Sequence, residues 1–333
     1  MGLILLMVCL FLLDLFLGSV RLSFVEILRA LFTGEGDPEH STIVLQFRLP
    51  RAITAIIAGF ALSVSGLQMQ TVFRNPLAGP FVLGISAGAS LGVAILVMGL
   101  SASVVFSGLY GFNNWAIAVA AWIGSGVILF LVLAVSIRVR DIMTILILGI
   151  LFGSATSAVV SILQYFSSET MLKAFVVWTM GSLGNVSISQ LRILTITTFT
   201  GTLIAVGMMK SMNLMLLGEN YASSLGLNIR WSRSMIFIST SILAGTVTAF
   251  CGPIAFIGIV VPHITRMIFK TADHRVLVPG SMVTGAVLLL ISDMISQLPG
   301  YDVTLPINSV TALLGIPVVI GIVIRSKKIS AFV

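Results

Sequence analysis

The chain has 333 residues, of which 58% are hydrophobic and 9% are charged. Soluble domains carry about a quarter charged residues, so this composition excludes an ordinary soluble protein and indicates an integral membrane protein. The net charge of +7 comes from single basic residues scattered between apolar spans, which argues against nucleic-acid binding. Cys9 and Cys251 both lie in apolar spans, so no disulfide framework is indicated.

Apolar runs along the chain predict ten membrane-spanning helices, because about 20 residues of helix cross the hydrocarbon core of a bilayer. The first run lacks the charged flank and the cleavage site of a signal peptide, so we expect it to be a membrane helix as well. The eighth run, near His263, is short. The expected spans are 1–19, 51–73, 81–99, 115–137, 142–166, 192–209, 234–251, 256–270, 279–297 and 308–324.

The lysines and arginines orient these spans, because positive charge is retained on the cytoplasmic side of a membrane. With the N-terminus inside, the cytoplasmic loops hold 12 of the 18 basic residues and the outer loops hold 6. We therefore predict that both termini lie in the cytoplasm, which agrees with an even number of spans. The loops are too short to form soluble domains, so residues 1–333 are expected to form a single transmembrane domain.

Two segments on the predicted outer side have features of their own. Residues 21–32 place apolar side chains at helical spacing and are expected to form a helix in the outer interface. Residues 169–189 hold apolar and aromatic side chains followed by Gly181 and Gly184. They predict a re-entrant or interfacial helix that could cover the outer mouth of the protein.

A third segment, residues 218–233, is polar and lies on the predicted cytoplasmic side. Glu219 suits the first turn of a short helix, and Gly226 suits the C′ position just after its last turn. Such a helix is either exposed to a partner subunit or is an ordinary loop helix without a partner. The residues by themselves leave both interpretations open.

The sequence lacks the motifs of an enzyme or a metalloprotein. It contains no G-x-x-x-x-G-K-[ST] loop for ATP phosphates and no H-E-x-x-H or C-x-x-C zinc motif. His40, His263 and His274 lie far apart in the chain and in different predicted layers. We therefore expect no catalytic residues, no cofactor and no metal site.

Two ladders of small residues recur at four-residue intervals, so each lies on one face of its helix. One ladder holds Gly84, Gly88 and Gly92, and the other begins with Gly149 and Gly153. Such a face either packs closely against a neighbouring helix, which is the commoner case, or forms a smooth wall along a translocation path. Serine and threonine residues in the same spans are polar enough to face water.

Asp14 and Asp293 lie inside predicted spans, where an ionisable side chain costs about 2.5–3.5 kcal/mol on insertion scales. We favour an interpretation in which each carboxylate accepts a hydrogen bond from a neighbouring helix. A proton relay, as an ion-coupled secondary transporter would need, requires a second ionisable group on the same face. The sequence shows no such group beside either aspartate.

Arg48 and Arg51 stand three residues apart at the start of the second span, so they share one helical face at the predicted outer interface. Positive charge is normally depleted on that side of a membrane. The two side chains are expected either to reach lipid headgroups or to dock an acidic surface of a partner protein. The second interpretation is attractive because the guanidinium fork matches a carboxylate.

Several blocks of the sequence resemble, in order, the iron-siderophore, haem and vitamin B12 permease family of bacterial ABC importers. These blocks are RLPR with the GFALSVSGLQMQ run, RNPLAGPFVLGISAGAS, GPIAFIGIVVPHITR, DHRVLVPGS and LPINSVTALLGIPVVI. The resemblance implies an all-α, polytopic type II ABC importer permease of about ten helices in the bacterial inner membrane. It also implies a transport function in which ATP is hydrolysed by a separate subunit.

The same resemblance implies the partners and the cargo. A permease of this family pairs with a second copy, as a homodimer, or with a close relative. Two cytoplasmic ATPase subunits lie beneath the pair, and a periplasmic or lipid-anchored binding protein delivers cargo from outside. The expected cargo is an iron chelate, either a ferric siderophore or haem, and vitamin B12 is the alternative.

Residue roles are carried over from the family only where this sequence matches its motifs. Arg48 and Arg51 match positions that meet acidic residues of the binding protein. Many relatives hold an arginine and a glutamate where this chain has Gln297 and Thr304, so the docking charge is expected to rest on those two arginines. The residues that match the cytoplasmic gate are Asn75, Leu77, Ile142 and Met143. The residues that match the segment coupled to the ATPase are Gly218, Glu219, Asn220, Tyr221, Ala222, Leu225 and Gly226.

Overall fold

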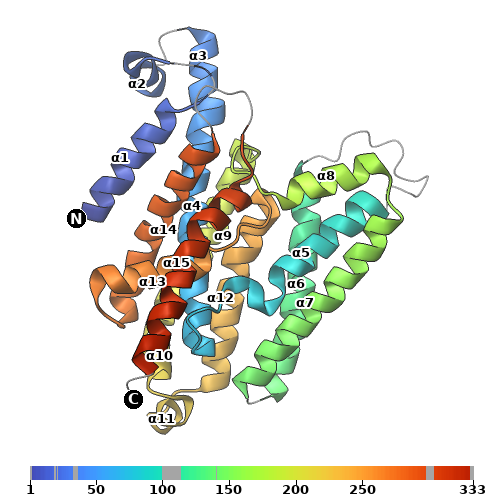
Figure 1. Cartoon of the computed structure of the whole chain (residues 1–333), viewed down its shortest axis with the longest axis vertical. Helices are drawn as coiled ribbons and strands as arrows, with labels where there is room; N and C mark the ends of the chain where they lie inside the picture. Colours follow the sequence, from blue (N-terminus) through green and yellow to red (C-terminus); the bar gives the residue numbers. More distant parts are fainter. Residues whose placement is uncertain are drawn as a thin grey trace.

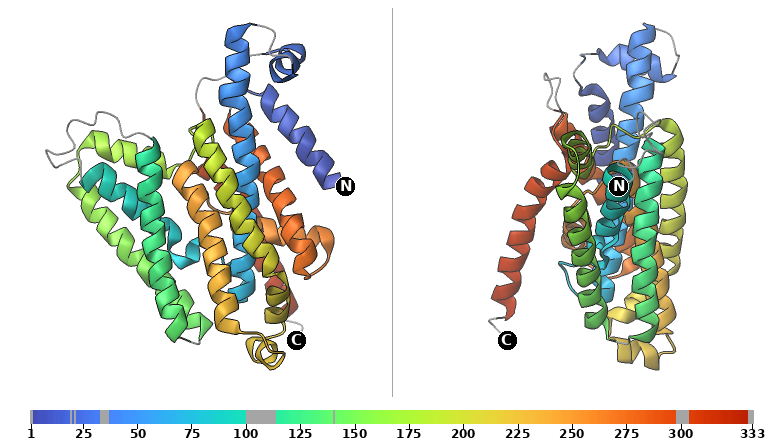
Figure 2. Two further views of the ribbon diagram at one scale, coloured as in Figure 1. Left: turned by 180° about the vertical axis from the view of Figure 1, so that it is seen from behind. Right: turned by 90° about the vertical axis from the view of Figure 1, so that its right-hand side faces the viewer.

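The regular secondary structure of the computed structural model is helical throughout the residues that it describes, which confirms the predicted all-α class. Those residues are 2–18, 20, 22–32, 37–99, 114–139, 141–297 and 304–330. The long helices run side by side, and short helices cover the two ends of the molecule (Figure 1 and Figure 2). We name these ends after α8 (Glu169–Thr179) and α11 (Glu219–Ser224), which lie at opposite ends.

A helix lies in each of the ten predicted spans, so the polytopic membrane bundle is confirmed. In the described part of the chain, five helices are long and apolar enough to cross a membrane, and a sixth span is a pair of helices bent by 50°. The five are α4 (Leu49–Phe73), α6 (Asn114–Arg138), α7 (Ile142–Tyr165), α12 (Ile229–Cys251) and α14 (His274–Ser296), and the bent pair is α9 (Ile188–Gly207) with α10 (Met209–Leu216). The shorter apolar helices are α1 (Gly2–Phe16), α5 (Ile85–Ala94) with the π-helical turn Ile95–Gly99, α13 (Ile257–Phe269) and α15 (Ile307–Ser330).

Polar residues fix where several of these helices begin. Asp141, Ser187, Asn228 and Asp273 precede α7, α9, α12 and α14, and each side chain accepts a hydrogen bond from a backbone N–H of the first turn. Such caps satisfy donors that have no partner inside the helix. Because Asp273 supplies this cap, α14 begins earlier than the hydropathy of the sequence predicts.

α4 lies at the centre of the bundle, where it contacts α9, α12, α13 and α14. In the most apolar stretch of the span that contains α4, 78% of the residues are buried, whereas 22% are buried in the corresponding stretch of α7. Glycines make the packing possible. A Cβ atom added to Gly66 would lie 1.8 Å from the carbonyl oxygen of Gly258 in α13, and one added to Gly59 would lie 2.5 Å from that of Gly285 in α14. The backbone of α4 therefore touches that of α13 at Gly66 and that of α14 at Gly59.

α5, α6 and α7 form a second group of helices beside this central bundle (Figure 1). α5 packs between the other two, and α12 joins the group to the bundle through its contacts with α5 and α6. Large apolar side chains on α6 and α7, such as Ile123, Phe130 and Ile147, are exposed on the surface of the isolated chain. Such faces are suited to lipid or to another protein, and not to water.

At the α8 end the helical rod of α4 extends beyond its predicted span. The π-helix Ile43–Arg48 and α3 (Pro38–Thr42) precede α4 without a break. α2 (Phe24–Phe32) packs beside this extension and leaves Phe24 and Val25 exposed. The helices predicted over residues 21–32 and 169–189 are thereby confirmed as α2 and α8, while their position in a membrane interface stays a prediction.

Candidate functional site

Arg48 ends the π-helix before α4, and its side chain turns into the protein, with only 8% of the residue exposed. The guanidinium donates hydrogen bonds to the carbonyls of Leu15 (2.8 Å), Phe16 (3.2 Å) and Val20. The last carbonyls of a helix have no partner within it, so Arg48 caps the end of α1. Arg48 is thus buried in the chain by itself because α1 takes up its donors, and its docking role stays a prediction.

Arg51, in the first turn of α4, forms a two-point ion pair with Asp293 of α14. Nε of Arg51 lies 3.0 and 2.9 Å from the two carboxylate oxygens, and Nη2 lies 2.8 Å from one of them. Asp293 is fully buried, and the Arg51 side chain is 19% exposed. The predicted bond from Asp293 to a neighbouring helix is confirmed. The charge of Arg51 offsets that of the buried carboxylate, and its docking role stays a prediction.

Gln297 joins this ion pair to α1. Its Nε2 donates to Oδ1 of Asp14 at 3.0 Å and to Oδ2 of Asp293 at 3.1 Å. We refer to Asp14, Arg51, Asp293 and Gln297 as the Arg51 cluster. The prediction of two isolated aspartates is wrong, and Gln297 is buried instead of lying on a docking surface. Its four-residue spacing from Asp293 is a sequence signal for a shared helical face, whereas no signal relates Asp14 to either residue.

At the opposite end of the bundle, residues 218–226 form the short helix that the sequence predicts. Glu219 lies in the first turn of α11, and Gly226 follows the helix with a φ of +85°. The backbone N–H of Gly226 donates to Ser223 (2.9 Å) and that of Leu227 to Ala222 (3.1 Å). This pair of bonds is the Schellman arrangement, so the predicted C′ position of Gly226 is confirmed.

α11 presents an apolar face outward and is held to the bundle by an ion pair. Tyr221 is 56% exposed and Leu225 is 55% exposed, while Ala222 is buried. Oε1 of Glu219 lies 2.7 Å from Nη2 of Arg233, which is buried in α12. A displacement of α11 would therefore pull on α12 through Arg233.

A cavity of about 510 Å³ opens between the end of α4, the start of α7 and the segment that enters α11. The cavity brings together residues of the predicted gate and residues of the predicted coupling segment, which are far apart in sequence. Its lining residues are Phe73, Arg74, Ile142, Met143, Leu217, Gly218, Glu219, Asn220 and Tyr221. Asn75 and Leu77, the other predicted gate residues, lie in the turn after α4, where the Asn75 side chain accepts the Leu77 N–H at 2.9 Å. The gate role of all four residues stays a prediction.

Asp141 fixes the side of this cavity that α7 provides. Its carboxylate accepts the hydroxyl of Thr144 at 2.6 Å and the backbone N–H of the same residue at 2.8 Å. These bonds hold the pKa of Asp141 below its ordinary value. The start of α7 is therefore a charged cap followed at once by the apolar side chains of Ile142 and Met143.

The glycine ladders pack closely against neighbouring backbone, and their role along a translocation path stays a prediction. A Cβ atom added to Gly88 would lie 2.5 Å from the oxygen of Gly124, and one added to Gly92 would lie 2.0 Å from that of Ala120, so these two residues pack against α6. A groove of about 500 Å³ lies between α5 and α7. Its lining residues are Phe81, Val82, Gly84, Ala87, Gly149, Ile150, Gly153, Ser154 and Ser157.

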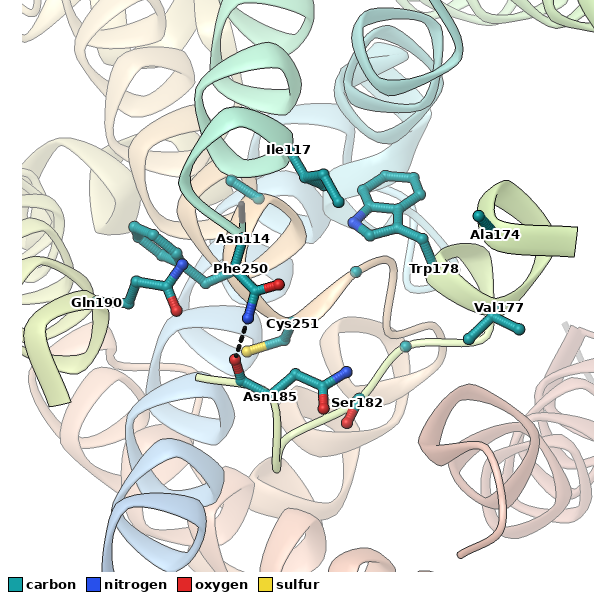
Figure 3. Close-up of a pocket in the computed structure, with 13 residues that line it drawn as sticks. Asn114, Ile117, Ala174, Val177, Trp178, Ser182, Asn185, Gln190, Phe250 and Cys251 are labelled. Atoms are coloured by element: carbon teal, nitrogen blue, oxygen red, sulfur yellow. Dashed lines mark hydrogen bonds between the residues drawn. The ribbon is translucent and has the colours of Figure 1, made fainter. Parts of the chain in front are cut away.

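A smaller cavity of about 180 Å³, which the sequence did not indicate, lies at the α8 end between α6, α8 and the end of α12 (Figure 3). Trp178, Phe250 and Ile117 supply apolar walls, and Asn114 donates a hydrogen bond to the carbonyl of Asn185 at 3.2 Å. Its polar groups are neutral amides and hydroxyls, which can bind a small uncharged group. Among the described residues, no three His, Cys, Asp or Glu side chains are placed to hold a metal ion.

Comparisons with known proteins agree with this architecture. The model of the FecCD transport family matches residues 5–325. The chain is 34% identical over 313 residues to the hemin transport system permease protein HmuU of Yersinia pestis, covering 94% of this chain and 91% of that one. It is 34% identical over 291 residues to the vitamin B12 import system permease protein BtuC of Escherichia coli O9:H4 (strain HS), covering 87% and 86%. It also superimposes on a solved ABC transporter assigned to the metal-chelate type, in an inward-facing conformation, with a TM-score of 0.84, 28% identity and 98% of each chain covered.

Proposed function

The chain belongs to the FecCD transport family, and on that premise we propose that it is the permease subunit of an ATP-driven importer served by a binding protein. Such a subunit supplies a path through the membrane and carries out no bond chemistry. The observation that carries this proposal is the exposed helix α11 beside a cavity that α7 also lines. Because the sequence has no P-loop, ATP hydrolysis belongs to a separate subunit.

Two cytoplasmic ATPase subunits would meet the permease at the α11 end. Tyr221 and Leu225 offer exposed apolar area for that contact, and the Glu219–Arg233 pair ties the contact surface to α12. In this proposal the whole chain acts as a single transmembrane domain. The gate formed by the turn after α4 and the start of α7 lies at the same end, so a partner bound to α11 would lie close to it.

A second copy of the chain would complete the path. Large apolar side chains are exposed on α7 and α15, for example Ile147, Leu313 and Ile320, as expected for faces that meet lipid or another subunit. The groove between α5 and α7 has small residues and the hydroxyls of Ser154 and Ser157 along it. A wall of this kind suits a bulky chelate that must not be held tightly in transit.

The binding protein would dock at the α8 end, so that end faces outward while α11 and both termini lie in the cytoplasm. The protein is a multi-pass membrane protein, and we propose the bacterial inner membrane as its location. Arg48 and Arg51 would support docking indirectly, by fixing α1 and α14 below the docking surface. Their hydrogen bonds to those helices favour this role over direct contact with the binding protein.

The cargo we propose is an iron chelate, either haem or a ferric siderophore. A corrinoid is the second candidate, because the haemin and vitamin B12 permeases are equally identical to this chain. The test is uptake into proteoliposomes that contain the permease together with its ATPase subunits and its binding protein. Haemin, a ferric siderophore and cyanocobalamin are compared, with and without internal ATP and with and without an ionophore.

We expect uptake of one of these compounds that needs ATP and is unaffected by the ionophore. Uptake that continues without ATP and is abolished by the ionophore would contradict the proposal and favour an ion-coupled secondary transporter. The compound that is taken up identifies the cargo class.

A further inference from the structure

Asn213 of α10 lies at the junction of three helices at the α11 end. Its Oδ1 accepts the backbone N–H of His274 at 2.9 Å and lies 2.6 Å from Nδ1 of the same residue, at the start of α14. Its Nδ2 donates to Oδ1 of Asp273 at 2.6 Å. On the other side of the imidazole ring, Nε2 of His274 lies 2.8 Å from the hydroxyl of Thr71 in α4. Asn213, His274 and Thr71 thus form a continuous polar chain from α10 to α4.

The chemistry of these groups fixes the direction of each bond. The Asp273 carboxylate only accepts, so the Asn213 amide must turn its NH₂ group toward it and its oxygen toward His274. That oxygen also only accepts, so Nδ1 of His274 carries a hydrogen. In the neutral ring Nε2 is then an acceptor for the Thr71 hydroxyl. The single hydrogen of that hydroxyl can go either to Nε2 or to the carbonyl of Leu67 in its own helix. Each member of the chain therefore depends on the one before it.

The position of α10 gives this chain of bonds a mechanical role. α10 contacts both α4 and α14, and only Leu217 and Gly218 separate it from α11. A second bond reinforces the attachment, because Nη2 of Arg74, just after α4, donates to the carbonyl of Met215 at 3.0 Å. Both His274 and Thr71 are buried, so water competes little for these hydrogen bonds.

We propose that Asn213 is a positioning residue that transmits displacement of α11 to α4 and α14 through His274 and Thr71. The physical link stands on the geometry of these side chains, and its use during transport rests on the function proposed above. A partner that pushes on α11 moves α10, and the two central helices follow because their ends are bonded to it. Without the link, α10 and α11 move while α4 and α14 stay behind.

Three variants and one control test the link. Asn213→Leu removes every hydrogen bond that the Asn213 side chain makes between α10 and the start of α14. Thr71→Val removes only the hydroxyl that meets His274, at nearly constant volume, and Thr71→Ser restores it. Thr248→Val is the matched control, because the Thr248 hydroxyl is buried in α12 and bonds only its own helix, at the carbonyl of Ala244. Should Asn213→Leu fail to fold, the two Thr71 variants carry the test.

The first measurement is amide hydrogen exchange of the full chain in lipid nanodiscs, which needs no transport activity. We expect Thr71→Val to speed exchange in residues 209–224, although Thr71 lies in another helix, and we expect Thr71→Ser and Thr248→Val to leave that segment unchanged. If Thr71→Val changes exchange only within α4, the link is refuted.

The second measurement is uptake per ATP hydrolysed by the reconstituted complex, for whichever of haemin, the ferric siderophore and cyanocobalamin the wild-type complex transports. Loss of the buried Thr71–His274 hydrogen bond should lower that ratio by about tenfold in Thr71→Val, and Asn213→Leu, which loses three bonds, should lower it at least as far, with ATP hydrolysis near the wild-type rate in both. If uptake and hydrolysis fall in proportion, the link does not couple them and the proposal is overturned. A wild-type complex without ATP-driven uptake of any of the three compounds would instead refute the proposed function, and the exchange experiment would still decide the link.

Discussion

Replacing Arg51 by leucine should destabilise the protein strongly, because it leaves the buried Asp293 carboxylate without its cation. Removing one partner of a buried ion pair costs about 3–5 kcal/mol. Three close nitrogen–oxygen contacts, from 2.8 to 3.0 Å, are lost at once. The Arg51 side chain is 19% exposed, so water screens part of the pair and we expect the lower end of that range, about 3 kcal/mol. That loss is a shift of about 150-fold in the unfolding equilibrium.

The double variant Arg51→Leu/Asp293→Leu separates the cost of an unpaired charge from the worth of the pair. Apolar replacement of both partners leaves no buried charge at either position, so we expect it to recover at least half of the loss. Arg192→Leu, at the exposed start of α9, is the control and should change stability by less than about 0.5 kcal/mol. Unfolding by added SDS in mixed micelles, followed by tryptophan fluorescence, measures all four proteins. A double variant that is less stable than Arg51→Leu would refute the reasoning.

Three further outcomes are expected. Gln297→Leu should lower the free energy of unfolding by about 1–3 kcal/mol in the same SDS titration, because two carboxylates lose a buried donor. Gln297→Glu should lower it further. A Gln297→Glu protein that is more stable than Gln297→Leu would contradict the Arg51 cluster. Gly92→Ala should destabilise, since its Cβ would lie 2.0 Å from the Ala120 oxygen, whereas Gly207→Ala, with open space around it, should be neutral or stabilising by up to about 1 kcal/mol. A backbone N–H of the first turn of α14 holds the pKa of Asp273 below its ordinary value of 3.8. The stability that the ionised Asp273 side chain contributes is therefore complete above pH 3.8, and it is lost as the pH falls through the lower pKa of the folded state. Thermal unfolding between about pH 6 and pH 3 should therefore depend less on pH in Asp273→Asn, and an unchanged dependence would count against the cap.

The sequence predicts those parts of the fold that depend on local chemistry. Hydropathy alone placed a helix in each of ten spans, since a membrane demands long apolar helices with satisfied backbones. Gly226 was placed correctly because the left-handed conformation after α11 favours glycine. The ladder of Gly88 and Gly92 indicated either close packing or the wall of a path, and the structure shows that these two residues pack against α6.

Contacts between distant segments could not be predicted in the same way. We expected Arg48 and Arg51 to reach lipid headgroups or a partner protein because they share one helical face at the start of a span. Whether such a side chain meets solvent or another helix depends on how α1 and α14 are rotated, and hydropathy carries no information on rotation. Asp14 illustrates the same limit. It lies 283 residues from Gln297 in the chain and belongs to no local sequence pattern with it, yet the two side chains are joined by a hydrogen bond.

α4 and α14 are joined at three levels, and this limits how the protein can move. The Arg51 cluster joins them at the α8 end, the backbones of Gly59 and Gly285 touch in the middle, and Thr71 meets His274 at the α11 end. These points span about 30 Å of helix, so the two helices can neither slide nor tilt against each other without breaking a buried contact. The α5–α7 group instead meets the bundle mainly through α12, with fewer contacts between α4 and α7. We therefore expect hydrogen exchange in α4 and α14 to be the same in the ATP-free and ATP-bound complex, with changes where α12 meets α5 and α6. Larger changes within α4 or α14 would show that this pair does not move as one unit.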